Sequence, residues 1–122
     1  MENIPLAKLV LKTAETEFEN ETGLFNMLQW GVQKPCGTAA CLAGHTLLQH
    51  GGYELAGPHV FRRTADGQYF AQSAISWEAQ RLLGMSREER KSGGHDIFYN
   101  FSNELALDTF RTLIAESEVT EE

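Results

Sequence analysis

The chain has 122 residues, 42% of them hydrophobic, and its 17 acidic residues against 10 lysines and arginines give a formal net charge of −7. This length and composition predict one domain over residues 1–122 whose core needs neither metal nor disulfide, and the negative charge makes nucleic acid a poor candidate partner. Because no stretch reaches the ~20 apolar residues of a membrane span and the first residues lack the features of a secretory signal, we expect a cytoplasmic protein without a membrane partner.

The first predicted element is an amphipathic helix over residues 4–18, with a proline suited to its first turn. Its apolar residues recur in steps of three and four, at Ile4, Ala7, Leu11, Ala14 and Phe18. The apolar segment over residues 24–30 fits either a short helix or an irregular stretch laid across the core. We interpret that segment as part of the core.

A second helix is predicted over residues 39–48, after a loop over residues 31–37. Thr38 is a good N-cap for this helix, and a pair of glycines ends it. Its small residues allow another backbone to approach closely, so we expect it to be the central helix of the fold. A glycine inside a helix costs ~1 kcal/mol relative to alanine, so Gly44 indicates a packing requirement at that position.

The helical period then disappears, and residues 60–64 and 68–70 predict a β-hairpin around the turn Asp66-Gly67. A lone hairpin is marginal in water, so it must lean on the helices. The next predicted helix has Ser73 or Ser76 as its N-cap and Gly84 as its stop. Its expected buried side consists of Trp77, Ala79, Leu82 and Leu83.

Residues 86–89 fit a capping box that begins a short helix, which a glycine pair at residues 93–94 ends. A last helix is capped by Ser102 or Asn103. Its inward residues are expected to be Leu105, Ala106, Phe110, Leu113 and Ile114. Residues 116–122 form an acidic tail that we expect to be disordered. The expected fold is therefore mainly α (α+β), with four to five helices around a central small-residue helix and one β-hairpin.

The most distinctive stretch is Pro-Cys-Gly-Thr-Ala-Ala-Cys-Leu-Ala-Gly-His at residues 35–45. It resembles a C-G-T-x-x-C-[IL]-A-G pattern that begins a helix in a group of small bacterial and phage proteins of unknown activity. Residues 83–89 and the aromatic pair at 98–99 also fit that group, whose members commonly have tryptophan where this chain has His45. The resemblance covers roughly residues 24–114. It implies a compact, mainly helical fold and an origin among phages or mobile elements.

The same stretch predicts a thiol nucleophile. If Thr38 is the N-cap, Cys41 lies in the first helical turn, where the helix dipole and free N–H groups lower a thiol pKa. His45 lies one turn further on the same face, within reach of the thiol. Cys41 as nucleophile with the imidazole of His45, and with His59 or His95 as a further partner, would make the chain a thiol-dependent hydrolase or transferase.

Zinc binding is a second hypothesis for these residues. Cys36, Cys41 and His45, completed by His59 or His95, have the ligand types of a Cys₂His₂ zinc site. The spacing lacks the close C-x2-C pair that grips one ion from a tight turn. Our leading expectation therefore has no cofactor.

That leading hypothesis is a non-enzymatic, protein-binding or regulatory module. It follows from a good apolar core, an acidic surface and the lack of a complete catalytic set in the sequence. Trp30 and the pair Arg62 and Arg63 on the hairpin are the candidate binding residues. The expected partner is another protein.

Overall fold

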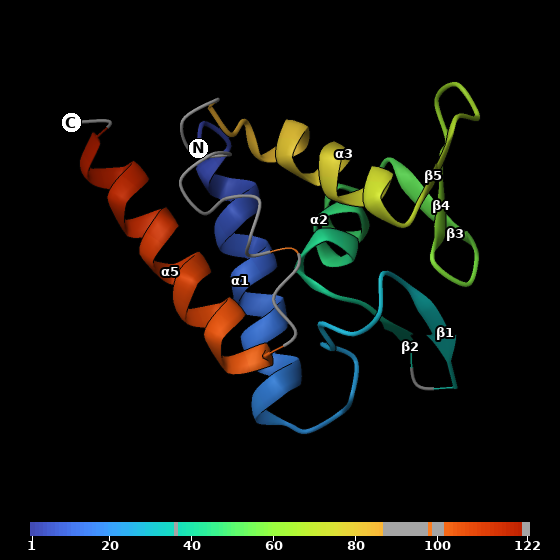
Figure 1. Ribbon diagram of the computed structural model, residues 1–122, viewed down its shortest axis with the longest axis horizontal. Helices are drawn as coiled ribbons and strands as arrows, with labels where there is room; N and C mark the ends of the chain where they lie inside the picture. The colour runs from blue at the N-terminus through green and yellow to red at the C-terminus, as the bar shows by residue number, and fades with distance from the viewer. Residues whose placement is uncertain (36, 87–97, 99–101, 121–122) are drawn as a thin grey trace.

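The computed structural model describes residues 1–35, 37–86, 98 and 102–120. Its helices are α1 (Ile4–Glu19), α2 (Leu42–His50), α3 (Ser73–Leu83) and α5 (Asn103–Thr120). Its strands are β1 (Val32–Lys34), β2 (Gly37–Ala39), β3 (Tyr53–Gly57), β4 (Val60–Arg63) and β5 (Tyr69–Ala71). Figure 1 shows α1 and α5 side by side at one end of the molecule, α2 and α3 in the middle, and the strands at the other end. The described residues thus form an α+β domain with four helices and two small antiparallel sheets.

Helix α1 confirms the prediction from the apolar period. Pro5 lies in its first turn, and the side chain of Asn3 caps it by accepting a hydrogen bond from the N–H of Leu6. The segment over residues 24–30 is irregular rather than helical. Phe25 and Met27 of this segment are buried in the core, as expected.

The chain between this segment and α2 differs from the prediction. Most of the described residues where a loop was expected lie in strands, because β1 and β2 pair with Gln33 opposite Thr38. Thr38 is therefore a strand residue, and the N-cap of α2 is Cys41. Extended backbone is favoured here because the N–H of Cys41 donates to the carbonyl oxygen of Gln29 at 2.6 Å, which holds the chain against the 24–30 segment. The predicted helix accordingly begins three residues late, at Leu42.

Helix α2 is the central helix of the fold, as predicted. All residues from Leu42 to Leu47 are buried, and the helix packs against both α1 and α3. An added Cβ at Gly44 would lie 2.1 Å from the carbonyl oxygen of Trp30 and 2.7 Å from the Cβ of Ala40. The packing requirement predicted at Gly44 is thus a close approach of the helix to the main chain at Trp30.

The predicted hairpin is confirmed as β4 and β5, with Phe61 opposite Phe70. The sequence prediction missed β3, which pairs with the other side of β4 and completes a three-stranded sheet. Strand β3 was hard to recognise because three of its five residues, Glu54, Ala56 and Gly57, are of types that are depleted in strands. One hairpin was expected, whereas the described residues form a hairpin and this sheet.

Helix α3 ends at Gly84, as predicted, in the left-handed conformation with φ of 68°. Its N-cap is Gln72, so neither serine proposed for that role has it. Trp77 was expected to be buried, but 57% of it is exposed. The buried stripe instead runs through Ile75, Ala79 and Leu83, which are four residues apart, and Trp77 lies on the opposite face of the helix.

At the start of α5, the hydroxyl of Ser102 accepts a hydrogen bond from the N–H of Leu105 at 3.3 Å, which confirms Ser102 as a capping residue. Four of the five predicted inward residues are buried, whereas Leu105 is 54% exposed. The predicted short helix and glycine pair, at residues 86–89 and 93–94, lie largely outside the described residues.

Helix α5 continues through Thr120, across residues expected to form a disordered tail. Ser117 is buried, and Glu118 forms a salt bridge with Lys8 of α1 at 3.2 Å. These contacts extend the packing of α5 against α1 beyond the apolar stripe. No helix in the described ranges is both long and apolar enough to cross a bilayer.

Candidate binding site

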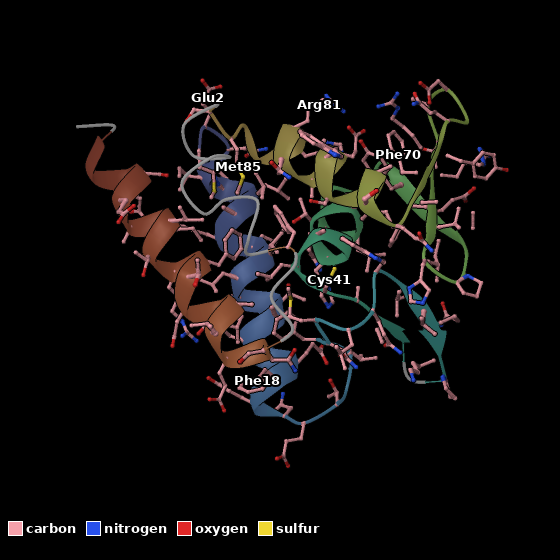
Figure 2. All side chains as sticks on the ribbon, in the orientation of Figure 1. Glu2, Phe18, Cys41, Phe70, Arg81 and Met85 are labelled. Atoms are coloured by element: carbon pink, nitrogen blue, oxygen red, sulfur yellow. The ribbon has the colours of Figure 1, made fainter. Side chains whose placement is uncertain are left out.

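The thiol of Cys41 lies in the core at the start of α2 (Figure 2). It is 1% exposed. Desolvation raises the pKa of Cys41 to about 11, against the opposing effect of the N–H groups of Gly44 and Ala43. A helix N-terminus lowers a thiol pKa only when burial does not outweigh it. The structure therefore gives Cys41 the properties of a small core residue rather than those of an activated nucleophile.

The imidazole of His45 is also buried, and its Nε2 lies 2.7 Å from the carbonyl oxygen of Leu24. Desolvation lowers the pKa of His45, so the ring is neutral and its Nε2–H donates to that carbonyl. Nδ1 is buried and has no hydrogen-bond partner among the residues that the structure describes. The ring thus anchors the segment before β1, and the third residue of the proposed catalytic set, His95, lies outside the described residues.

Only some of the proposed zinc ligands are among the residues that the structure describes. Cys36 is outside the described residues, and the Nδ1 of His59 accepts a hydrogen bond from the main-chain N–H of Trp30 at 3.2 Å. Among the residues the structure describes, no group of three or more histidine, cysteine, aspartate or glutamate side chains is placed to hold a metal ion. The structure therefore places Cys41 at the N-cap of α2 and His45 within that helix, but no described ligand set is assembled around them.

The candidate binding residues on β4 face opposite sides of the sheet, because neighbouring residues of a strand alternate. Arg62 lies on the outer face, where its Nε is 3.1 Å from a carboxylate oxygen of Glu54. Arg63 lies on the inner face and contacts α3. Trp30 is half-buried and packs against the core. The two arginines therefore do not form one basic patch.

A buried carboxylate joins the inner face of the sheet to α3. Glu78 is 5% exposed, and its Oε2 accepts hydrogen bonds from the hydroxyl of Tyr53 and from Nη1 of Arg63, the latter at 2.8 Å. Arg81 donates from Nε and Nη2 at 2.6 and 2.9 Å. The hydrogen bond from Arg81 leads the effects that hold the pKa of Glu78 below its usual range, so the carboxylate is charged at neutral pH.

Arg63 uses all three of its guanidinium nitrogens in this arrangement. Its Nε and Nη2 bind the carboxylate of Asp66, and Nη2 also donates to the side-chain oxygen of Gln68 at 2.7 Å. Its guanidinium lies 5.2 Å from the centre of the Phe70 ring. The hydrogen bonds from Arg63 hold the pKa of Asp66 down at about 2. Arg63 therefore fixes the position of the β4–β5 turn rather than offering a free charge.

Arg81 differs from Arg63 in its exposure. Its side chain is 58% exposed, although its carboxylate partner is buried. Nε and Nη2 are used in hydrogen bonds, whereas Nη1 makes none to the described residues. Arg81 therefore presents a guanidinium edge to solvent from a position that Glu78 holds in place.

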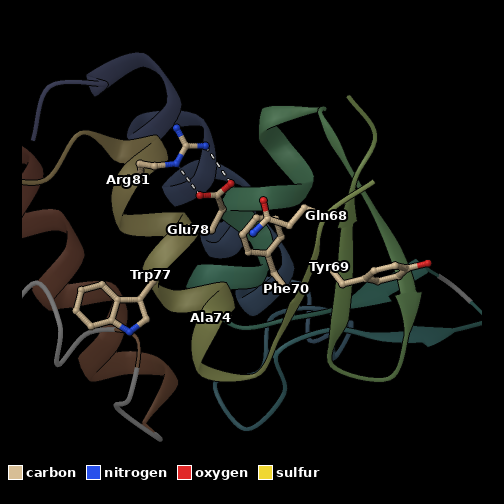
Figure 3. A pocket seen from close by; sticks show the side chains of 7 residues that line it. All are labelled: Gln68, Tyr69, Phe70, Ala74, Trp77, Glu78 and Arg81. Carbon is tan, nitrogen blue, oxygen red and sulfur yellow. Dashed lines mark hydrogen bonds and ion pairs between the residues drawn. The ribbon is translucent and has the colours of Figure 1, made fainter. Parts of the chain in front are cut away.

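A groove of about 400 Å³ lies between β5 and α3, beside this network (Figure 3). It is lined by Gln68, Tyr69, Phe70, Ala74, Trp77, Glu78 and Arg81. Phe70 points toward α3, whereas the ring of Tyr69 points away on the other side of the strand. Trp77 projects from α3 at the margin of the groove. The exposed Trp77, the nearly buried ring of Phe70 and an arginine thus line one hollow.

Sequence reasoning missed this site, although one signal was present. Trp77, Arg81 and Ser73 are four residues apart, so they share one face of the predicted helix, opposite the apolar stripe. An exposed tryptophan beside an arginine is typical of protein interfaces. The role of Glu78 had no local signal, because Tyr53 and Arg63 are 25 and 15 residues away in the sequence.

In comparisons with known proteins, no family model, no curated protein and no solved structure matches the chain. The resemblance of the cysteine stretch to small bacterial and phage proteins stays a prediction.

Proposed function

We propose that this protein is a binding module that takes a partner protein into the groove between β5 and α3. The observation that carries the proposal is the placement of Trp77. A tryptophan with 57% of its surface exposed stands beside a groove whose opposite wall is a strand and whose rim carries Arg81. Tryptophan, tyrosine and arginine are the side chains most enriched among residues that dominate binding energy.

The network beneath the groove supports this proposal. Because Glu78 is held by Tyr53, Arg63 and Arg81, the groove is built on side chains whose positions are fixed before a partner arrives. Binding to a fixed surface costs less conformational entropy than binding to one that must first become ordered. The proposal keeps Cys41 in the core, where its burial places it.

The test uses a photoreactive residue in the full chain. Benzoylphenylalanine replaces Trp77 in one variant and Leu9 in another; Leu9 is an exposed apolar residue of α1, outside the groove. Both variants are irradiated in the cells from which the protein comes, and cross-linked proteins are identified by mass spectrometry. We expect one partner that is captured from position 77 and not from position 9.

That partner is then purified and its affinity is measured by calorimetry. Trp77→Ala should weaken its binding by about tenfold or more, because a truncated interface tryptophan leaves its site unfilled. Leu9→Ala should leave the affinity unchanged. Equal capture at both positions, or equal affinity of Trp77→Ala and the unmodified protein, would show that the groove is not the binding site.

A further inference from the structure

In the part of the chain that the structure describes, β5 is an open edge of the three-stranded sheet, whose order is β3-β4-β5. The N–H of Arg63 donates to the carbonyl oxygen of Gln68, and the N–H of Gln72 donates to that of His59. Hydrogen-bonded pairs in an antiparallel ladder recur every second residue, so residues 68, 70 and 72 direct their main-chain groups toward β4. The N–H and C=O groups of Tyr69 and Ala71 consequently point away from the sheet, and no described residue pairs with them.

This open edge forms one wall of the groove. Three consecutive residues, Gln68 to Phe70, line the groove. Successive side chains of a strand point to opposite faces, so these three side chains cannot all point into it. Because the ring of Tyr69 points away from α3, its main chain is the part that reaches the groove. A ligand in the groove would therefore meet unpaired backbone groups on one side and Ala74 and Trp77 on the other.

The charge of the groove favours an acidic ligand. Its charged lining residues are Glu78 and Arg81, and of these only Arg81 is substantially exposed. Nη1 of Arg81 is available to a carboxylate, which a guanidinium binds with charge-assisted hydrogen bonds. The ion pair of Arg81 and Glu78 is neutral overall, but its carboxylate is 5% exposed and its guanidinium 58%, so the charge that this rim presents to solvent is positive.

Resting on the proposed function, we infer that the partner contributes an extended segment that adds to the sheet as a strand beside β5. Its main chain pairs with Tyr69 and Ala71, an apolar side chain lies against Phe70 and Trp77, and a carboxylate two residues away meets Arg81. Residues two apart in a strand share a face, which sets this spacing. Strand addition of this kind obtains affinity from backbone hydrogen bonds and specificity from alternate side chains.

A library of random heptapeptides displayed on phage is the probe. Panning on the full chain should enrich peptides in which a large apolar residue and an aspartate or glutamate are two positions apart. The enriched peptide is then synthesised, and its affinity is measured with its carboxylate intact and replaced by the amide. We expect the amide to bind about tenfold more weakly, through loss of the contact with Arg81.

Main-chain pairing is tested on the same peptide by methylating its amide nitrogens one at a time. Methylation at every second residue should weaken binding by about tenfold or more, and methylation at the residues between should not. On the protein side, Ala71→Pro removes an N–H that faces the peptide and should also abolish binding. Ala71→Ser keeps that N–H and should bind as well as the unmodified chain.

The outcomes separate this inference from the proposed function. If Trp77→Ala weakens binding of a peptide but methylation of its amides at any position does not, the groove is still the binding site. Strand addition is then overturned. If Trp77→Ala lowers the affinity of no enriched peptide, the groove is not the binding site. A dimer in sedimentation analysis that Ala71→Pro dissociates would assign the edge to a second copy of the chain and overturn the partner segment. The methylation series uses the unmodified protein. It therefore tests main-chain pairing with β5 even if Ala71→Pro fails to fold.

Discussion

Cys41 and His45 lie one helical turn apart, and burial suppresses the charged form of each. A catalytic pair of this type needs a thiolate beside a proton acceptor, and burial disfavours the thiolate of Cys41. Both residues have a structural role. Cys41 occupies the N-cap position of α2 without a side-chain capping bond, and its N–H donates to the carbonyl oxygen of Gln29. His45 holds Leu24 through its ring.

The reactivity of Cys41 follows from its pKa of about 11 and its burial. At about pH 8 such a thiol is ionised in only roughly one molecule in a thousand, and only the thiolate is alkylated. In a Cys36→Ser background, we expect iodoacetamide to modify Cys41 at least about a hundredfold more slowly in the folded protein than in urea. Mass spectrometry over time measures both rates. Equal rates would show that the thiol is accessible and activated.

His45 should make stability depend on pH. Burial lowers its pKa from 6.5, so below that pH the unfolded chain binds more protons than the folded one. The free energy of unfolding therefore falls as the pH drops below 6.5 and continues to fall until the folded-state pKa is passed, with a slope of at most about 1.4 kcal/mol per pH unit for one proton.

Urea titrations from about pH 7 to about pH 5 measure this effect, a range in which histidine is the side chain that normally titrates. His45→Gln should give a flatter profile than the unmodified chain, because the other histidines are common to both proteins. Parallel profiles would contradict the buried, neutral imidazole.

At the scale of elements, the parts that were predicted are those whose signal is local. The apolar period predicted α1, and the Asp66-Gly67 turn predicted the pair β4 and β5. Gly84 predicted the end of α3. The start of α2 was missed because Thr38 is a good cap by sequence, yet the bonds of residues 40 and 41 to the 24–30 segment extend the chain past it. The groove was missed for the same reason: its network joins residues from three elements.

Gly44 offers a test of how closely α2 approaches the chain at Trp30. Intrinsic helix propensity alone would make Gly44→Ala stabilising by about 1 kcal/mol. Because the added Cβ would lie 2.1 Å from the carbonyl oxygen of Trp30, we expect destabilisation instead, by about 2 kcal/mol or more. Urea unfolding measures the change.

Gly52→Ala is the matched control for this substitution. Its added Cβ meets only the side chain of His50, at 3.2 Å, so a small shift of the imidazole accommodates it. The control should change stability much less than Gly44→Ala. A stabilising effect of Gly44→Ala would mean that α2 lies further from residue 30 than the structure places it.

At the scale of the whole molecule, the first residues tie two helices together. Asn3 accepts a hydrogen bond from the N–H of Leu6 in α1, and its Nδ2 donates to the carbonyl oxygen of Leu82 in α3 at 3.1 Å. Its main-chain N–H donates to the carbonyl oxygen of Leu83 at 3.0 Å. One side chain therefore caps the start of α1 and satisfies a carbonyl group at the end of α3, 79 residues later in the chain.

Two substitutions separate these roles of Asn3. Asn3→Ala loses both side-chain hydrogen bonds and should lower the free energy of unfolding by about 1 to 2 kcal/mol. Asn3→Ser keeps a good N-cap for α1 but is too short to replace the amide donor to Leu82, so it should recover only part of that loss. Thermal and urea unfolding of the three proteins measure the difference. Full recovery by serine would reduce Asn3 to a cap of α1, whereas no recovery would place its whole contribution in the link to α3.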